Sequence, residues 1–333
     1  MTAFLLLILF LNLCIFLNYE RLSTFINLYD IPDNKRKLHK KKIPNIGGFF
    51  IIINLLFFYI SKLIFIDLID DYNLFINFFS FFIITLVIFI LGYLDDRYNL
   101  SANYKLFFLG IIFFISIYFD EELLINHLYF QTFSIEIIFS KWSFLFTCLC
   151  FLLFLNAMNM FDGINIQSAA FFFLIFSVFF FKNIFLSFSL LILVLLSFYL
   201  LLNFKSKIFF GSNGIFVLSY LGGYILIKSY NLSKLNVEEI LILLLYPGLD
   251  MFRLFLERIS RGKNPFYPDR NHIHHLIGNL LKNNNFTILV SVLLFSLPII
   301  FFYLFNINSL IIIFSIILIY ISSFIFFKFL WKK

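Results

Sequence analysis

The sequence has little charge and few of the residues that interrupt helices. Only 13% of its 333 residues are charged, and it contains 6 prolines and 12 glycines. By contrast, 62% of the residues are hydrophobic, and the mean hydropathy is +1.00. A water-soluble domain needs more polar surface than this composition supplies. The composition therefore excludes a soluble globular protein and predicts an all-α polytopic integral membrane protein.

Cysteine is also scarce, with three residues in the whole chain. Cys14, Cys148 and Cys150 all lie in apolar runs, where a small side chain packs between helices or against lipid. Two positions along a helix separate side chains by about 200°, so Cys148 and Cys150 point apart. This spacing argues against a shared metal ion or a disulfide between them.

Long apolar runs dominate what is present, and a helix needs about 20 apolar residues to cross a bilayer. Eleven segments meet or approach that length, and we treat 1–333 as one transmembrane domain. The first segment lacks the basic start and the small-residue cleavage site of a signal peptide, so we interpret it as a helix. The predicted segments are 3–17, 46–66, 74–94, 106–119, 142–160, 166–181, 184–202, 213–229, 238–256, 286–304 and 308–329.

Positive charge divides unevenly between the two sets of connecting loops. With eleven spans, one set holds 20 of the 25 Lys and Arg residues, whereas the 18 acidic residues divide equally. Lys and Arg gather in cytoplasmic loops of membrane proteins, so the basic set is predicted to be cytoplasmic. The N-terminus would then face outward and the C-terminus inward. A basic inner face suits membrane lipids and phosphates, and we expect no nucleic acid partner.

The first basic loop, 30–48, reads DIPDNKRKLHKKKIPNIGG. Charge alone favours a loop that binds anionic lipid and sets the topology. The prolines and the Gly47-Gly48 pair instead favour a shaped segment, because they restrict or free the backbone where the chain re-enters the membrane. Both interpretations stay open from the sequence.

The second loop contains Asp95 and Asp96 in LGYLDDRYNL, at the inner end of a predicted span. Two adjacent carboxylates repel each other, and a divalent cation or a shared proton relieves the repulsion. The alternative is a solvated helix end.

The third loop reads NAMNMFDGIN, with Asn156, Asn159 and Asp162 at a spacing of three. This spacing places them on one side of a helix, and Gly163 then allows that helix to end. Carboxamides beside a carboxylate suit a sugar, a base or a hydrated metal ion, although ordinary helix capping explains asparagine equally well.

The fourth loop ends in FFGSNG, just before a predicted span. Gly211 and Gly214 favour a turn around Ser212 and Asn213 that could present backbone N–H groups to a phosphate. A plain turn between two helices is an equal alternative.

The fifth loop, 247–285, includes PDRNHIHH and is dense in groups that bind phosphate and sugar hydroxyls. Its histidine spacing matches none of the zinc signatures, so we interpret the segment as a phosphate-recognition site rather than a zinc site. The polar groups are Asp250, Arg253, Arg258, Arg261, Lys263, Asp269, Arg270, His272, His274 and His275.

Taken in order, DIPDNKRKLH, LGYLDD, NAMNMFDG, the FFG turn and PGLDMFR with PDRNHIHH resemble a known family. It is the polyprenyl-phosphate N-acetylhexosamine-1-phosphate transferase family, the MraY/WecA superfamily or glycosyltransferase family 4. The HIHH form preceded by PDR is similar to the WecA-like branch. The resemblance covers most of the chain, and every motif falls on the predicted cytoplasmic side.

The resemblance implies an active site on the cytoplasmic face of a bacterial inner membrane. It implies transfer of an N-acetylhexosamine-1-phosphate, with GlcNAc-1-phosphate expected, from a UDP-sugar to undecaprenyl phosphate with release of UMP. Such a reaction initiates a lipid-linked surface glycan such as O-antigen of lipopolysaccharide or a cell-wall polymer. Mg²⁺, or Mn²⁺ in its place, is the implied cofactor, and a homodimer is compatible with the family.

The resemblance also assigns residues. Asp95, Asp96 and Asp162 are the implied catalytic and metal-binding carboxylates. Ser212 stands where the family has a metal-binding Asp, and Asn165 stands where it has a second Asp. A hydroxyl is a weaker Mg²⁺ ligand than a carboxylate. The implied substrate-binding residues are Lys37, His39, Asn156, Asn159, Arg258, Asp269, Arg270, His272, His274 and His275.

Two other classes compete with the enzyme. Ser212 is the best argument for a catalytically silent membrane paralogue that scaffolds or regulates glycan assembly. A secondary transporter would need polar groups at mid-membrane and repeated broken helices, whereas here the charged groups gather at one interface.

Overall fold

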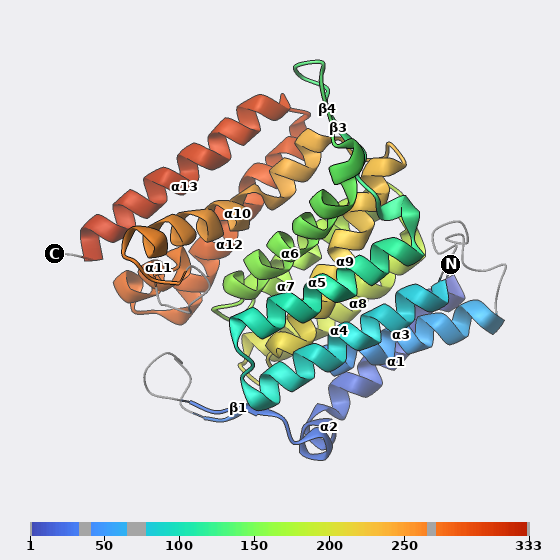
Figure 1. The fold of residues 1–333 in the computed structure, drawn as a ribbon. Helices are drawn as coiled ribbons and strands as arrows, with labels where there is room; N and C mark the ends of the chain where they lie inside the picture. The colour runs from blue at the N-terminus through green and yellow to red at the C-terminus, as the bar shows by residue number, and fades with distance from the viewer. Residues whose placement is uncertain (1, 33–40, 65–77, 265–270, 332–333) are drawn as a thin grey trace.

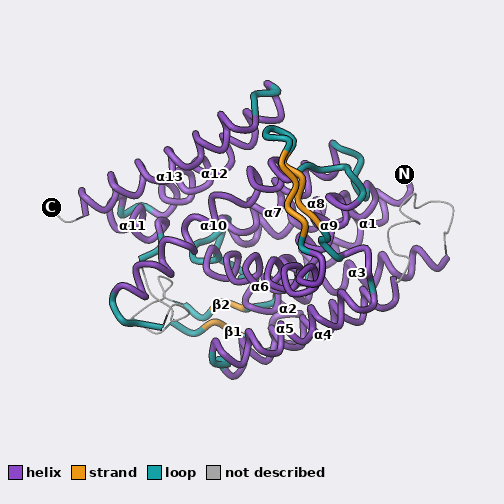
Figure 2. Tube along the Cα trace, turned by 45° about the horizontal axis from the view of Figure 1, so that its top comes forward, coloured by secondary structure: helices purple, strands orange, loops and turns teal. Residues whose placement is uncertain are grey.

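The structure is a computed structural model of the chain, and it describes residues 2–32, 41–64, 78–264 and 271–331. These residues form a bundle of long helices whose axes run in broadly similar directions, with two short hairpins toward opposite ends (Figures 1 and 2). The helices are α1 (Thr2–Leu17), α2 (Tyr19–Ile26), α3 (Gly47–Ile64), α4 (Phe78–Tyr98), α5 (Ala102–Phe119), α6 (Ser143–Phe161), α7 (Gln167–Phe181), α8 (Leu186–Phe204), α9 (Gly211–Asn231), α10 (Val237–Ser260), α11 (Ile273–Leu281), α12 (Asn284–Phe305) and α13 (Ser309–Trp331).

The helical membrane class predicted from the composition is confirmed. Seven helices in the described ranges are long and apolar enough to cross a membrane, or up to eight if the bent pair α1 and α2 forms one span. Each of the eleven predicted segments coincides with a helix, although α7 is only 15 residues long. The count of eleven spans stays a prediction.

Helix α9 forms the centre of the bundle and packs against α3, α4, α6 and α7. Nearly all of its residues, from Asn213 to Ser229, are buried. By contrast, α5 and α13 expose rows of large apolar side chains along their outer faces. Exposed apolar rows of this kind are stable in hydrocarbon and unstable in water, so these two faces fit contact with lipid.

Glycines allow three helices to meet at the start of α9. A Cβ atom on Gly48 of α3 would lie 2.1 Å from Oδ1 of Asn213, and one on Gly92 of α4 would lie 2.6 Å from its Cα. Any side chain at either position would separate the helices. Gly47 is equally crowded by Phe210, at 2.6 Å. Both glycines lie in α3 and serve close packing. The shaped first loop stays a prediction, because its residues 33–40 lie outside the described residues.

The first basic loop is bonded to the turn that precedes α9. Strands β1 (Tyr29–Asp30) and β2 (Ile43–Pro44) pair antiparallel, and Asn45 forms a parallel bridge with Phe209. Phe209 N–H donates to the carbonyl of Pro44 at 2.9 Å, and Gly47 N–H donates to that of Phe209 at 3.1 Å. Two segments far apart in the sequence thus meet at one end of the bundle.

The second hairpin, β3 (His127–Phe130) with β4 (Ile135–Ile138), projects from the opposite end of the bundle (Figure 1). Neither hairpin was predicted. Buried ionic groups lie near this end: Lys228 is 1% exposed and pairs with Asp120 at 3.0 Å and Glu122 at 2.9 Å.

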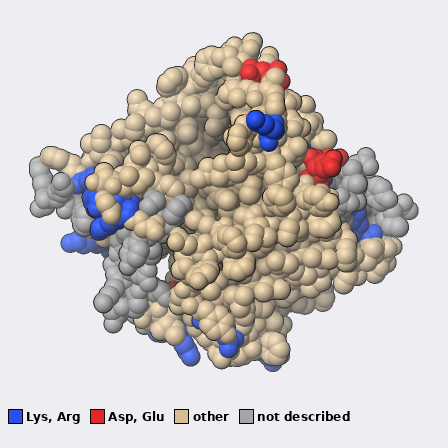
Figure 3. Space-filling model, viewed as in Figure 1, with Lys and Arg blue, Asp and Glu red and all other residues tan. Residues whose placement is uncertain are grey.

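In Figure 3 the visible Lys and Arg side chains lie mostly along the left and lower edges, on the side of β1 in Figure 1. This asymmetry agrees with the charge pattern of the loops.

Helix α10 extends further than the sequence predicted. It continues through Pro247 to Ser260, whereas the predicted span ended at residue 256. Arg258, which lay beyond the predicted span, is therefore on the same helix as Asp250 and Arg253. The short helix α11 follows and begins at Ile273, with His272 as its N-cap residue.

Candidate active site

One cavity of about 1040 Å³ lies at the end of the bundle that carries β1 and β2. Residues from the first loop, α4, α5, α6, the start of α9, α10 and α11 line it. The structure thus brings together most of the residues that the sequence motifs singled out. The predicted residues in its wall are Asp95, Asp96, Asn156, Asn159, Asp162, Ser212, Arg258, His272, His274 and His275.

Asp96 caps the N-terminus of α9. Its Oδ1 accepts a hydrogen bond from the N–H of Ser212 at 2.8 Å, and its Oδ2 accepts one from the N–H of Asn213 at 3.0 Å. A helix N-terminus leaves N–H groups unpaired and carries partial positive charge, so a carboxylate there is stabilised twice. The turn that was predicted to offer its N–H groups to a phosphate offers two of them to Asp96.

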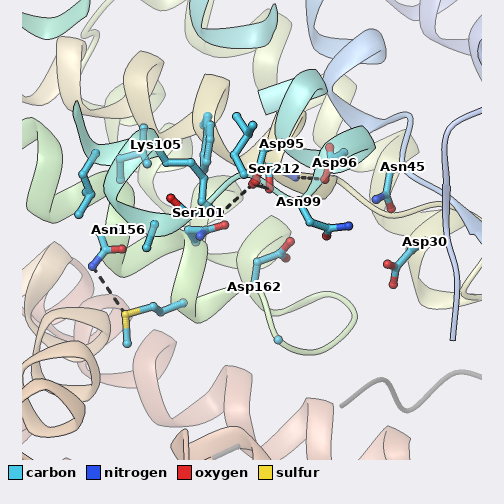
Figure 4. Close-up of a pocket in the computed structure, with 18 of the residues that line it drawn as sticks. Asp30, Asn45, Asp95, Asp96, Asn99, Ser101, Lys105, Asn156, Asp162 and Ser212 are labelled. Carbon is cyan, nitrogen blue, oxygen red and sulfur yellow. Dashed lines mark hydrogen bonds and ion pairs between the residues drawn. The ribbon is translucent and has the colours of Figure 1, made fainter. Parts of the chain in front are cut away.

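Asp95 makes different contacts from its neighbour. It is 5% exposed, and its Oδ2 accepts a hydrogen bond from the Ser212 hydroxyl at 2.6 Å. Lys105 of α5 pairs with the same oxygen at 3.1 Å. The two adjacent carboxylates therefore make different contacts. Asp96 accepts hydrogen bonds from two backbone N–H groups and from the Asn213 side chain, whereas Asp95 contacts the side chains of Ser212 and Lys105, which line the cavity (Figure 4).

Asp162 lies on another part of the wall, apart from Asp95, Asp96 and Ser212 (Figure 4). Helix α6 ends at Phe161, and Asp162 is its C-cap residue, so the predicted helix end beside Gly163 is confirmed. The Ser168 hydroxyl donates to Oδ1 of Asp162. Burial raises the pKa of this carboxyl to about 7, although that hydrogen bond opposes the rise.

The helical spacing of the asparagines brings both into the wall, since Asn156 and Asn159 of α6 line the cavity with Asp162. The Asn156 side-chain amide approaches the sulfurs of Met160 at 3.7 Å and Met251 at 3.6 Å. These are weak acceptors, so its N–H groups keep capacity for a polar ligand. Asn165 instead donates to the Ser206 hydroxyl at 2.6 Å and does not line the cavity.

Three histidines form one cluster on α11 and at its N-terminus. The rings of His272 and His274 are stacked with their centroids 5.3 Å apart. The ring centroids of His274 and His275 are 4.4 Å apart. His274 is 0% exposed, and neither of its ring nitrogens makes a hydrogen bond among the described residues. Burial lowers its pKa well below the usual value, and the neighbouring His275 and His272 lower it further. His274 is therefore neutral, while His272 is held by Asp250 at 2.9 Å.

Gly163 allows the loop after α6 to meet this cluster. A Cβ atom on Gly163 would lie 2.0 Å from Nε2 of His274, which is closer than any non-bonded contact permits. The loop after α6 and helix α11 can therefore pack together only because residue 163 has no side chain.

The donor set suits a hard cation. Mg²⁺ takes oxygen ligands, keeps several waters and uses substrate phosphates, so it needs few protein carboxylates. Asp95, Asp162 and Ser212 provide oxygen donors in one cavity. Within the ranges that the structure describes, however, no three His, Cys, Asp or Glu groups lie close enough to form a preassembled metal cluster. The residues fit a Mg²⁺ ion that substrate phosphates help to hold.

Some predicted residues cannot be placed, and some residues in the wall were not predicted. Lys37, His39, Asp269 and Arg270 lie outside the described residues. Lys105, Asn45, Asn99 and Asp30 also line the cavity and were not predicted to belong to the site. Lys105 follows the carboxylate pair by about ten positions, and its place at the start of an apolar helix on the basic side was the available signal.

The sequence matches the family model described as glycosyl transferase family 4 over residues 78–230. It is also similar to proteins named undecaprenyl-phosphate alpha-N-acetylglucosaminyl 1-phosphate transferase. The relative from Thermotoga maritima is 26% identical over 79% of this chain and 77% of its own length. The relative from Yersinia pestis is 26% identical over 78% of this chain and 71% of its own.

A third relative of the same name, from Escherichia coli (strain K12), is 26% identical over 80% of this chain and 74% of its own length. The matched family region contains Asp95, Asp96, Asp162 and Ser212. The comparisons therefore confirm the resemblance to glycosyltransferase family 4 that the motifs predicted.

Proposed function

We propose that the chain transfers GlcNAc-1-phosphate from UDP-GlcNAc to undecaprenyl phosphate and releases UMP. The observation that carries the proposal is the convergence of five sequence motifs on one cavity at the basic end of an apolar bundle. An enzyme that joins a soluble sugar nucleotide to a lipid phosphate needs a polar cavity open at the membrane surface. We place this end of the bundle on the cytoplasmic side of a bacterial inner membrane because Lys and Arg gather there.

The reaction brings two anions together. An oxygen of the lipid phosphate attacks the β-phosphorus of the sugar nucleotide, and the bond from that phosphorus to the oxygen bridging to the α-phosphate breaks. The lipid gains a P–O–P link to the sugar, and UMP leaves. The groups around the cavity must therefore offset negative charge and align the phosphates.

Basic side chains of this chain can offset that charge. Lys105 is 22% exposed and pairs with Asp95, and Arg258 and His272 also line the cavity. Two backbone N–H groups hold the carboxylate of Asp96, whereas the carboxylate of Asp95 contacts only the side chains of Ser212 and Lys105 among the described residues. Asp95 is therefore the carboxylate best placed to accept a proton from a lipid phosphate monoester. A Mg²⁺ ion would supply further neutralisation, held by substrate phosphates together with oxygens of Asp95 and Ser212 on one part of the wall or of Asp162 on the other.

Uncharged polar groups can hold the rest of the donor. Asn156 and Asn159 lie on one side of α6, so their carboxamides face a shared region of the cavity. Amides pair with the hydroxyl and acetamido groups of a sugar or with the edge of a uracil. The apolar part of the wall, with Leu106, Leu109 and Phe216, borders the membrane-embedded helices and suits the start of an isoprenoid chain.

A direct assay tests the proposal. Membranes that contain the protein are incubated with radiolabelled UDP-GlcNAc, undecaprenyl phosphate and Mg²⁺, and lipid is extracted. We expect labelled lipid that is absent from membranes carrying Asp95→Asn. UDP-GalNAc in a parallel reaction tests the choice of hexosamine. A normally folded wild-type protein that labels no lipid would favour the silent paralogue instead.

A further inference from the structure

A buried network of residues that do not themselves line the cavity holds His272. Its centre is Asp250 of α10, which is 3% exposed. Oδ2 of Asp250 contacts Nδ1 of His272 at 2.9 Å, while Oδ1 accepts hydrogen bonds from Arg253 and Tyr320, each at 2.9 Å. The Ile273 N–H adds a longer bond at 3.3 Å. Both carboxylate oxygens are therefore engaged, and the carboxylate cannot rotate without breaking bonds.

Tyr320 brings the last helix of the chain into this network. It lies on α13, whose outer face is apolar and exposed, yet Tyr320 itself is 4% exposed. Its hydroxyl donates to Asp250 and accepts a hydrogen bond from Nε of Arg253 at 2.7 Å. Arg253 also donates to the carbonyl of Asn271, at 2.7 Å, directly before His272. The network thus fixes both the ring of His272 and the backbone that leads to it.

The geometry has a chemical consequence for His272. A carboxylate that accepts the Nδ1–H fixes the tautomer of an imidazole and leaves Nε2 as the nitrogen available to a ligand. His272 lines the cavity, where the phosphates of a nucleotide-sugar would lie. A fixed ring places its donor at one position, whereas a free ring samples several and loses orientation.

We propose that Tyr320 is a positioning residue that acts through Asp250 to hold His272 against the phosphates of the substrate. The inference rests on the proposed function, because it takes the ligand beside His272 to be a nucleotide diphosphate. Its competitor is a purely mechanical role, in which the Tyr320 hydroxyl only fastens α13 to α10. The two roles differ in one respect: a positioning role needs His272, whereas a mechanical role does not.

A double-mutant cycle separates these roles. The purified variants are Tyr320→Phe, His272→Gln and the pair, and each is assayed for kcat, for KM of UDP-GlcNAc and for the Kd of UDP in the presence of Mg²⁺. The matched control is Tyr246→Phe. Tyr246 is 2% exposed and its ring lies 5.6 Å from that of Tyr320, but its hydroxyl makes no hydrogen bond within the described part of the chain.

We expect Tyr320→Phe to lower kcat by about tenfold when His272 is present, the size of a lost hydrogen bond to a charged group. In the His272→Gln background the same change should cost less than roughly twofold, because the group that it positions is gone. KM should change less than kcat, and Tyr246→Phe should match the wild type. Equal losses in both backgrounds would overturn the proposal.

UDP binding keeps the inference testable apart from catalysis. If the wild type binds UDP but transfers nothing, the proposed function fails, and the same cycle in Kd still decides whether Tyr320 acts through His272. If the wild type neither binds UDP nor transfers, both fail. Should Tyr320→Phe not fold, Asp250→Asn replaces it in the cycle, since an amide of the same shape offers only one accepting oxygen. Additive effects in that cycle would likewise overturn the proposal.

Discussion

The hydroxyl of Ser212 donates a hydrogen bond to Oδ2 of Asp95 at 2.6 Å. Ser212 stands at the position where the family that the motifs resemble has an aspartate. Lys105 contacts the same oxygen at 3.1 Å. A carboxylate at 212 would oppose Asp95 at this distance unless a cation lay between them. Serine therefore removes one negative charge from the cavity and replaces a repulsion by a hydrogen bond.

A carboxylate at position 212 should raise the affinity of the site for Mg²⁺. We predict that Ser212→Asp lowers the Mg²⁺ concentration for half-maximal transfer by about three- to tenfold, because an anionic oxygen binds a hard cation more tightly than a hydroxyl does. Ser212→Asn, which has nearly the same shape but no charge, should give no such decrease. A Mg²⁺ titration of product formation in all three proteins measures this. If Ser212→Asp needed the same or a higher Mg²⁺ concentration for half-maximal transfer, residue 212 would not be a metal ligand.

The two adjacent aspartates should respond differently to the same substitution. Asp95→Asn should lower turnover by roughly 10²–10⁴-fold, the range for a lost acid or base, with little change in the apparent Tm. Asp96→Asn should lower the apparent Tm as well, because an amide has only one accepting oxygen for the two N–H groups of Ser212 and Asn213. Loss of a cap costs about 1–2 kcal/mol. Thermal unfolding and turnover of both variants test the difference, and near-full activity in Asp95→Asn would exclude its role.

Gly163 should be intolerant of any side chain. We predict that Gly163→Ala lowers turnover at least tenfold and lowers the apparent Tm, because its Cβ would overlap the buried His274 ring. The matched control is Gly248→Ala, where a Cβ atom meets nothing within 4 Å. Turnover and melting of both variants provide the comparison. If Gly163→Ala behaved like Gly248→Ala, the loop after α6 would not depend on contact with α11.

Stability should fall on acidification because His274 is buried and neutral. Its folded-state pKa lies well below the usual 6.5, so the unfolded chain binds the extra proton first as the pH decreases. Stability is therefore retained above about pH 6.5 and is lost below it, by up to about 1.4 kcal/mol per pH unit. We expect His274→Gln to lose less apparent Tm between pH 7.5 and pH 5.5 than the wild type.

The control for this experiment is His127→Gln, because the His127 side chain is 51% exposed and faces solvent at the other end of the bundle. It should retain the acid sensitivity of the wild type. Identical losses of apparent Tm in the wild type and in His274→Gln would contradict the assignment of the sensitivity to His274.

The orientation can be tested with single cysteines in a background that lacks the three native ones. A cysteine at Ser134, between β3 and β4, should react with a membrane-impermeant thiol reagent from outside intact cells. A cysteine at Lys263, after α10, should react only after the cells are opened. Both positions are exposed in the structure, so access is decided by the membrane. The reverse pattern would remove the cytosolic substrate from the account.

The helical membrane class and the helix positions follow from hydropathy, because apolar runs of about 20 residues leave few alternatives in lipid. The loops were less predictable. The predicted span at 238–256 contains Pro247, Asp250 and Arg253, but it ends four residues before α10, which continues to Ser260. Contacts with other helices hold the polar part of α10, since Asp250 accepts hydrogen bonds from Tyr320 of α13 and from the N–H of Ile273 of α11.

The membership of the site could be predicted from motifs, whereas its internal division could not. The sequence alone does not predict which of Asp95 and Asp96 caps a helix, because this depends on the position of the N-terminus of α9 relative to the two side chains. Tyr320 carried no signal in the sequence, because a tyrosine in an apolar run is ordinary. Its role appears only when α13 is placed beside α10.

The most direct test of the account follows the β-phosphate. Purified protein is incubated with undecaprenyl phosphate, Mg²⁺ and UDP-GlcNAc labelled with ³²P at the β-phosphate, and lipid and nucleotide products are separated. The account predicts ³²P in the lipid together with an equal amount of UMP, and loss of both in Asp95→Asn. Unlabelled lipid with release of UDP, or labelled lipid that persists in Asp95→Asn, would contradict sugar-1-phosphate transfer in this cavity.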